Sequence, residues 1–148
     1  MLILNIATIV CIGLMIGTEF AVSAFINPVL WKLERGAQIH AIRLFAETLG
    51  FVMPFWYGLG MLLLLVEMFL LRHQPHVLPL AFASGIWAAV ILMSVLFLVP
   101  INNRLARSES SGIAEKAQND HRRWHALHRV RVLALTAAMI LFLVSIGS

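Results

Sequence analysis

The sequence predicts an all-α integral membrane protein, a four-helix bundle whose second and fourth helices extend into a cytoplasmic cap. Three observations carry this prediction. Hydrophobic residues make up 61% of the 148 residues. Charged residues make up only 12%, against about 25% in soluble domains, and they leave four long uncharged runs. Because so small a soluble domain has too much surface to cover with so few polar residues, we expect residues 1–148 to form a single transmembrane domain.

The same composition excludes several other classes of protein. Intrinsic disorder needs low hydrophobicity and a high net charge, and a disulfide scaffold needs more than the single Cys11. The sequence has no phosphate-binding loop, G-x-S-x-G, H-E-x-x-H or C-x-x-C pattern. Cys11 lies in an apolar run, and we expect it to pack as a small hydrophobic residue.

The first span is expected over residues 4–27. It is uncharged except for Glu19, and no Lys or Arg precedes it as in a signal peptide, so we expect it to be retained. At ~1.5 Å per residue, Glu19 lies about two thirds of the way across the span from its outer end. An ionisable residue at that depth usually faces the bundle interior or a wet cavity. Glu19 is therefore a candidate site residue, and the alternative is a protonated or snorkelling carboxyl group.

The second span is expected over residues 50–71. The preceding residues 33–49 contain one Gly and no Pro, and apolar residues recur among them at helical spacing. They predict a helix that runs into the second span and is kinked or interrupted at Pro54.

Three polar residues on this preceding helix share one face. His40, Arg43 and Glu47 can all point in the same direction, and Arg43 and Glu47 have the spacing of an ion pair. We consider His40 and Arg43 as candidate substrate-binding residues. A surface pair at the membrane edge is an equally good interpretation.

Large aromatic residues occur deeper in the spans than an interfacial belt requires. They are Trp56 and Tyr57 in the second span and Trp87 in the third, which is expected over residues 78–100. Buried Trp and Tyr side chains usually find a hydrogen-bond partner. Trp56 and Trp87 are therefore candidates to line an apolar substrate cavity, with ordinary helix packing as the alternative.

Asn102 and Asn103 follow Pro100 at the end of the third span. Two readings of this amide pair remain open: a helix stop with a turn, or a site that binds a polar group of a substrate.

The fourth span is expected over residues 129–147, and the helix-compatible residues 113–131 lead into it. His121, His125 and His128 share one helical face, a pattern that invites a metal or haem site. Because the spacing is common by chance, we favour an interfacial role beside Trp124, with Arg131 snorkelling. No metal ion is predicted.

The basic residues predict an orientation. Ten of the eleven Lys and Arg residues lie in the first and third connections, and the second connection carries only Arg72. By the positive-inside rule, the first and third connections are cytoplasmic and both termini lie outside, in a plasma (inner) membrane. The net charge of +4 is thereby explained by topology, so no nucleic-acid partner is expected.

Several short motifs then combine into a family resemblance. They are Gly17-Thr18-Glu19-Phe20, Asn27-Pro28-Val29-Leu30, a central Pro54, Pro100-Ile101-Asn102-Asn103-Arg104-Leu105 and Trp124-x-x-x-His128-x-x-Arg131. In order and placement the chain resembles the anthrone oxygenase-like family of small four-helix membrane proteins. Many bacterial members of this family have no assigned function.

The resemblance implies an activity and a set of residues. Fungal relatives oxidise an anthrone to an anthraquinone with molecular oxygen, without a metal or organic cofactor, so no cofactor is expected here. The residues that match the family pattern are Glu19, Asn103, Trp124, His128 and Arg131. Such chemistry needs a base and donors for an oxyanion. We assign the base to His128 or Glu19 and oxyanion binding to Asn103 and Arg131, with Asn102 and Trp124 as substrate-binding residues.

Three functions are therefore considered. The first is an oxygenase that acts on an apolar aromatic or quinol-like small molecule dissolved in the lipid bilayer. The second is a small transporter, because short four-helix exporters also carry one charged residue in the first helix. The third is a non-catalytic accessory membrane subunit. A homo-oligomer is compatible with each of them.

Overall fold

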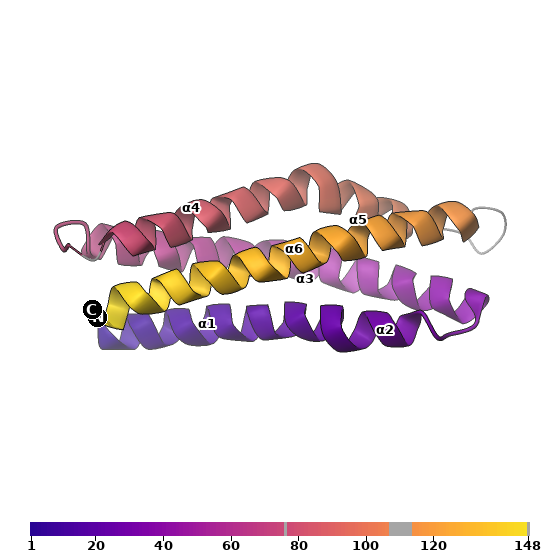
Figure 1. The fold of residues 1–148 in the computed structure, drawn as a ribbon, viewed down its shortest axis with the longest axis horizontal. Coiled ribbons are helices and arrows are strands. Elements are labelled where there is room, and N and C mark those ends of the chain that lie inside the picture. The colour runs from indigo at the N-terminus through magenta and orange to yellow at the C-terminus, as the bar shows by residue number, and fades with distance from the viewer. Residues whose placement is uncertain (76, 107–113, 148) are drawn as a thin grey trace.

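The computed structural model describes residues 1–75, 77–106 and 114–147, and these residues form helices and short connections without any strand. Four long helical rods run side by side (Figure 1). Each rod is long and apolar enough to cross a membrane. The prediction of an all-α, four-helix membrane protein is confirmed.

Each rod contains one of the predicted spans. The first rod joins α1 (Leu2–Ala21), the π-helical turn η1 (Val22–Ile26) and α2 (Asn27–Leu30). The second rod is α3 (Arg35–Leu70). The third joins α4 (Val77–Met93), the π-helical turn η2 (Ser94–Leu98) and α5 (Val99–Ala106), and the fourth is α6 (Ala114–Gly147).

The second and fourth helices extend well beyond their predicted spans, as the sequence indicated. α3 begins at Arg35 rather than near residue 50, and α6 begins at Ala114 rather than near residue 129. α3 continues through Pro54 without a break, so the interruption that the sequence allowed at this proline does not occur. Proline is tolerated inside membrane helices because neighbouring groups can satisfy the backbone that it leaves unpaired.

The two π-helical turns each precede a proline. η1 ends two residues before Pro28, and η2 ends two residues before Pro100. Proline removes the N–H that would bond to the carbonyl four residues earlier. A local change to wider π turns accommodates this loss, and such turns are frequent at functional sites.

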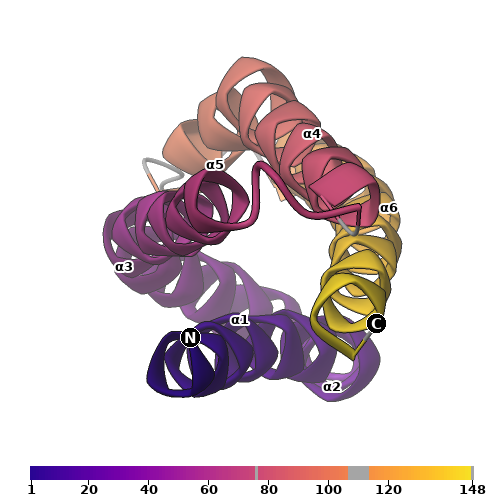
Figure 2. The same ribbon diagram turned by 90° about the vertical axis from the view of Figure 1, so that its left-hand side faces the viewer.

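The four rods enclose an apolar core. Viewed from the end that holds both termini, α1 lies next to α3 and α6, and α4 also contacts α3 and α6 (Figure 2). The centre of the core is filled by large side chains of all four rods, namely Ile12, Met15, Leu64, Trp87, Leu135 and Phe142. We call the end with both termini the terminal end. We call the opposite end, which carries Lys32, Arg35, Arg104, Arg122 and Arg123 on its exposed surface, the basic end.

An ion pair joins two rods at the basic end. Arg104 of α5 donates from Nε to Asp120 Oδ2 at 2.8 Å and from Nη2 to Oδ1 at 3.1 Å. This two-point contact fixes the planar guanidinium against the carboxylate. It therefore holds α5 beside the start of α6, across residues 107–113, which lie outside the described part of the chain.

Candidate functional site

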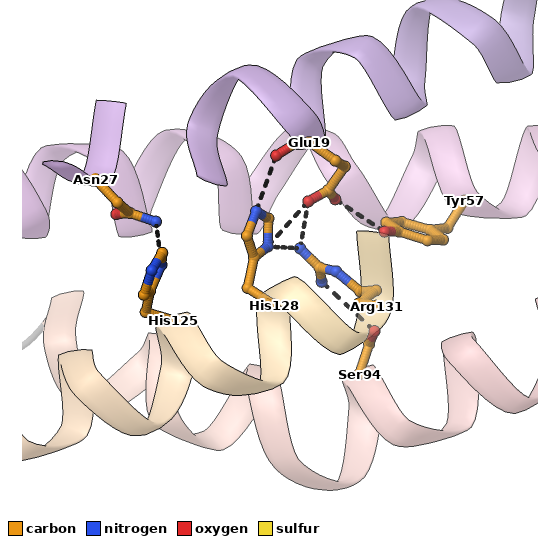
Figure 3. A network of polar contacts seen from close by, with 7 residues as sticks. All are labelled: Glu19, Asn27, Tyr57, Ser94, His125, His128 and Arg131. Carbon is orange, nitrogen blue, oxygen red and sulfur yellow. Dashed lines mark hydrogen bonds and ion pairs between the residues drawn. The ribbon is translucent and has the colours of Figure 1, made fainter. Parts of the chain in front are cut away.

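A cluster of polar side chains lies buried between the rods in the half of the bundle near the basic end. Glu19 of α1 is 1% exposed and Arg131 of α6 is 8% exposed. Arg131 Nη2 donates to Glu19 Oε2 at 2.7 Å, and the hydroxyl group of Tyr57 on α3 donates to Glu19 Oε1 at 2.8 Å (Figure 3). The carboxylate is thus held from two sides by donors on two other helices. We call Glu19, Tyr57, Ser94, His128 and Arg131 the ion-pair cluster.

His128 supports the ion pair from the side. Its Nε2 lies 3.0 Å from the backbone oxygen of Glu19, and because a carbonyl oxygen only accepts, Nε2 carries the hydrogen. Its Nδ1 lies 2.9 Å from Nη2 of Arg131, which only donates, and 3.1 Å from Glu19 Oε2. The neutral tautomer with its hydrogen on Nε2 satisfies the contacts to the Glu19 backbone oxygen and to Arg131 Nη2. Nη2 donates one hydrogen to Nδ1 and the other to Glu19 Oε2. His128 therefore positions both charged groups.

All members of the ion-pair cluster except His128 line one end of a cavity of about 190 Å³. Polar side chains line this end, whereas most of the remaining wall is apolar and comes from η1, α3, α4, η2, α5 and α6. The polar lining residues are Glu19, Tyr57, Ser94, Asn102 and Arg131, and the apolar ones include Met53, Ile91, Leu98 and Trp124. An apolar cavity with a few convergent polar groups is the usual form of a small-molecule site.

The π-helical turns bring polar residues onto the required faces. Glu19 and Asn27 are both buried, although eight residues separate them, about 80° around a regular α-helix. Ser94 and Asn102, which both line the cavity, have the same spacing. In each case a π turn lies within the interval and absorbs about one residue. Its presence returns both side chains of each pair to nearly the same face.

Arg131 has donor capacity that the protein does not use. Within the described part of the chain, its Nε is buried and has no hydrogen-bond partner. Its Nη1 makes only a long contact of 3.5 Å to Ser94 Oγ, at the limit of a hydrogen bond. Only Nη2 is firmly engaged, with Glu19 and His128. The guanidinium can therefore donate a further hydrogen bond to an oxygen atom of a bound molecule.

Two of the predicted substrate-binding residues line the cavity. Trp124 stacks on His128, with ring centroids 4.5 Å apart and planes 12° apart, and forms part of the wall. The amide nitrogen of Asn102 donates to the backbone oxygen of Ala46 at 2.6 Å, which ties α5 to α3. The side chain of Asn102 also fills the space beside Gly50, because a Cβ added to Gly50 would lie 2.5 Å from the Asn102 amide nitrogen.

Trp56 and Trp87 contribute to packing and do not line the cavity. Trp87 is fully buried, and its Nε1 donates to the backbone oxygen of Tyr57 at 3.1 Å. Trp56 donates to the backbone oxygen of Cys11 at 3.1 Å. Both indoles have the expected hydrogen-bond partners, and those partners tie α3 to its neighbours instead of facing a substrate.

His40, Arg43 and Asn103 lie apart from the ion-pair cluster. All three are exposed, and none lines the cavity. The predicted ion pair is present, since Arg43 Nε donates to Glu47 Oε1 at 2.9 Å, and it lies on the surface of α3. The surface interpretation of this group is the one that the geometry matches.

The histidine face of α6 is divided among different partners. His125 Nδ1 lies 3.0 Å from the amide nitrogen of Asn27, and His121 packs against Trp31 with centroids 4.9 Å apart. Trp124 lies in ring contact with both His121 and His128. Among the described residues, no group of three His, Cys, Asp or Glu side chains is placed to hold a metal ion.

Two members of the ion-pair cluster were not selected from the sequence. Tyr57 was noted only as a deep aromatic residue, and Ser94 has no distinguishing pattern around it.

A second buried carboxyl group lies outside this site. Glu67 of α3 is fully buried and accepts a hydrogen bond from Thr8 Oγ1 of α1 at 3.2 Å. It does not line the cavity. In the sequence it directly follows an uncharged run, near the end of the second predicted span at residues 50–71.

Comparisons with known proteins give one result. Neither the curated proteins nor the solved structures yield a significant match. The family model described as anthrone oxygenase matches residues 43–141. The matched segment covers well over half of the chain and includes Tyr57, Ser94, Trp124, His128 and Arg131 but not Glu19. The chain belongs to the anthrone oxygenase family.

Proposed function

We propose that this protein is a membrane oxygenase that oxidises an apolar aromatic substrate with an acidic C–H or O–H group, of the anthrone or quinol type, using molecular oxygen. The observation that carries the proposal is the buried Glu19–Arg131 pair at the polar end of an otherwise apolar cavity. The family supports it independently.

The base in this proposal is Glu19. Its carboxylate lines the cavity, whereas His128 does not and has both ring nitrogens engaged within the cluster. Glu19 removes a proton from the activated methylene group of the substrate, and the negative charge moves from the carboxylate to the substrate oxygen. Arg131 stays close to one negative charge throughout, so the buried site never carries an uncompensated charge.

The oxyanion of the substrate is stabilised by the spare donors of Arg131. Nη1 is available to it, because its contact with Ser94 Oγ is long, and the buried Nε of the same guanidinium group has no partner among the described residues. Donors that are fixed in place before the reaction are effective because they need no reorganisation as charge develops. The remaining apolar wall holds the rings and keeps water away from the carbanion.

The overall reaction balances with oxygen as the sole oxidant. The substrate carbanion forms a C–O bond with molecular oxygen, and the resulting peroxide takes back the proton from Glu19. The hydroperoxide then loses water to give a carbonyl group. One methylene group and one O2 become one carbonyl group and one H2O.

The test measures oxygen consumption and anthraquinone formation by the purified protein in lipid nanodiscs with anthrone. Rates are compared with nanodiscs that lack the protein, since anthrones also oxidise slowly by themselves. Glu19→Gln keeps the size of the side chain and removes the base, and it should lower the protein-dependent rate by about 100-fold or more.

Glu47→Gln is the matched control, because it removes an exposed carboxylate that is also paired with an arginine. Its rate should equal that of the unmodified protein. A rate no higher than that of empty nanodiscs, or a fully active Glu19→Gln variant, would contradict the proposal.

A further inference from the structure

The exposed residues that line the cavity lie along the side of the bundle, on α3, η2 and α5. The outer wall of the cavity is formed by exposed residues of the two rods α3 and α4–η2–α5, among them Val95 and Val99, which are 57% and 40% exposed. These residues lie within the candidate membrane spans. When these spans cross a bilayer, the outside of the opening faces hydrocarbon and its inner end holds the Glu19–Arg131 pair.

The surface around the opening is suited to lipid. Next to it on α3, Phe51 and Phe55 are 72% and 71% exposed, and Leu96 and Phe97 project from η2. Large exposed apolar side chains on a helix that spans a membrane face the acyl chains. A water-borne polar molecule would have to cross this layer to reach the cavity.

One lip of the opening consists of residues with little or no side chain. Gly50, Pro54 and Gly58 recur every fourth residue along α3, are exposed and line the cavity. Asn102 closes the gap beside Gly50, whereas a Cβ on Gly58 would meet no heavy atom within 4 Å among the described residues outside its own helical turn. A larger side chain at Gly58 would therefore have room on this lip of the opening.

A polar group lies at each end of the passage. At the closed end, Arg131 is more than nine-tenths buried and keeps an unpartnered Nε within the described structure. At the lip, Pro54 has no N–H to give to the carbonyl oxygen of Gly50. An oxygen-bearing ring compound can thus be bound at its inner edge while its outer edge remains near lipid.

We propose that the gap between α3 and η2–α5 is a lateral entrance through which a flat, membrane-dissolved ring compound enters edge first. Its oxygen reaches Arg131, and apolar substituents on its far edge stay in the bilayer. The substrate class is thereby extended to rings that carry alkyl chains too long for the cavity. The chemistry at the closed end rests on the proposed function, but the entrance can be tested by binding alone.

The test uses a product-like probe, anthraquinone with and without a long alkyl chain, in nanodiscs that contain the full protein. Quinone binding is followed by quenching of tryptophan fluorescence, because Trp124 lies in the cavity wall. Concentrations are expressed per lipid, so that partitioning is the same for each variant. The alkyl-substituted probe should bind as tightly as anthraquinone itself.

Gly58→Phe should block the entrance and weaken the binding of both probes by about tenfold or more, since an added aromatic side chain must be displaced before a ring can pass. Gly85→Phe is the matched control: Gly85 is also an exposed helical glycine with open space around its Cβ, but it does not line the cavity. Val95→Trp on the opposite lip provides a second obstruction if Gly58→Phe does not fold.

Two results would overturn the lateral entrance: unchanged binding in a folded Gly58→Phe or Val95→Trp variant, or loss of binding on adding the alkyl chain. Tight binding of anthraquinone-2-sulfonate, which stays in water, would also overturn it. The two proposals can fail separately. If the variants block binding as expected but the unmodified protein consumes no oxygen, the lateral entrance is supported and the oxygenase function is contradicted.

Discussion

Glu19 and Arg131 show what a buried ion pair contributes at the scale of single residues. Removing two charges from water costs about as much as their attraction returns, so such a pair is not in itself evidence of stability. Removing one partner is different, because it leaves the other charge buried and unpaired. The Glu19–Arg131 pair, with its 2.7 Å contact and near-complete burial, therefore predicts strong coupling between the two positions.

We expect Glu19→Gln and Arg131→Met each to lower the free energy of unfolding by about 3 kcal/mol, and the double variant to lose less than the sum. The measurement is a double-mutant cycle on unfolding of the protein in mixed detergent micelles. The Arg43–Glu47 pair supplies the control, because its side chains are 48% and 46% exposed. Arg43→Met and Glu47→Gln should each cost no more than about 0.5 kcal/mol. Additive losses at Glu19 and Arg131 would show that the two charges are not coupled.

The sequence identified three members of the ion-pair cluster by two separate signals. Glu19 is the single charge in the first apolar run, and His128 and Arg131 belong to the motif that resembles the family. Tyr57 and Ser94 could not be selected, because a hydroxyl group becomes a site residue only through the rotation of its helix against the others. The same limit explains Asn103, which shares a motif with Asn102 but points outward.

At the scale of elements, the contact between α3 and α4 depends on a close approach at Gly60. A Cβ at this position would lie 2.5 Å from the Trp87 ring, and Trp87 Nε1 donates to the backbone of α3 at Tyr57. Small residues allow membrane helices to pack closely in this way. Tyr57 also donates a hydrogen bond to Glu19. The Gly60–Trp87 contact therefore helps to position Tyr57 against the ion-pair cluster.

We expect Gly60→Ala to lower the free energy of unfolding by about 1–3 kcal/mol, because the methyl group forces the fully buried indole to move. Gly58→Ala lies two residues away on the same helix, where an added Cβ has open space. It should leave stability unchanged or raise it slightly, since alanine favours the helix. Unfolding of both variants in mixed micelles tests this, and equal stability of the two would contradict the close approach.

The elements themselves were largely predictable, with exceptions at the prolines. Long uncharged runs predict helices because the backbone must satisfy its own hydrogen bonds in lipid. The course of the chain at a proline depends on its neighbours, so neither the unbroken α3 at Pro54 nor the π turns before Pro28 and Pro100 could be derived from the sequence. These turns matter for the site, because they set which faces carry Asn27 and Asn102.

At the scale of the whole molecule, the charges are sorted along the length of the bundle. Exposed basic residues gather at one end, and both termini lie at the other. Among the described residues, the two carboxyl groups that are almost fully buried, Glu19 and Glu67, lie on different helices and in separate hydrogen-bond groups. The distribution of apolar and charged residues along the chain could predict the four-helix class and the basic end. It could not distinguish the buried Glu67 from a carboxylate at the membrane surface, because both occur at the edge of an apolar run.

The distribution of Lys and Arg leads to a prediction about the orientation of the whole bundle. We expect the basic end to face the cytoplasm and both termini to face outward, because positive residues in short connections are retained on the cytoplasmic side. Alkaline phosphatase, which is active only outside the cytoplasm, is fused after Ser148, after Gln74 or after Ala106 in a bacterial host. The first two fusions should be active and the third inactive. A green fluorescent protein series, which reports the cytoplasmic side, should give the opposite pattern. An active fusion after Ala106 would reverse the orientation and place the ion-pair cluster in the outer half of the membrane.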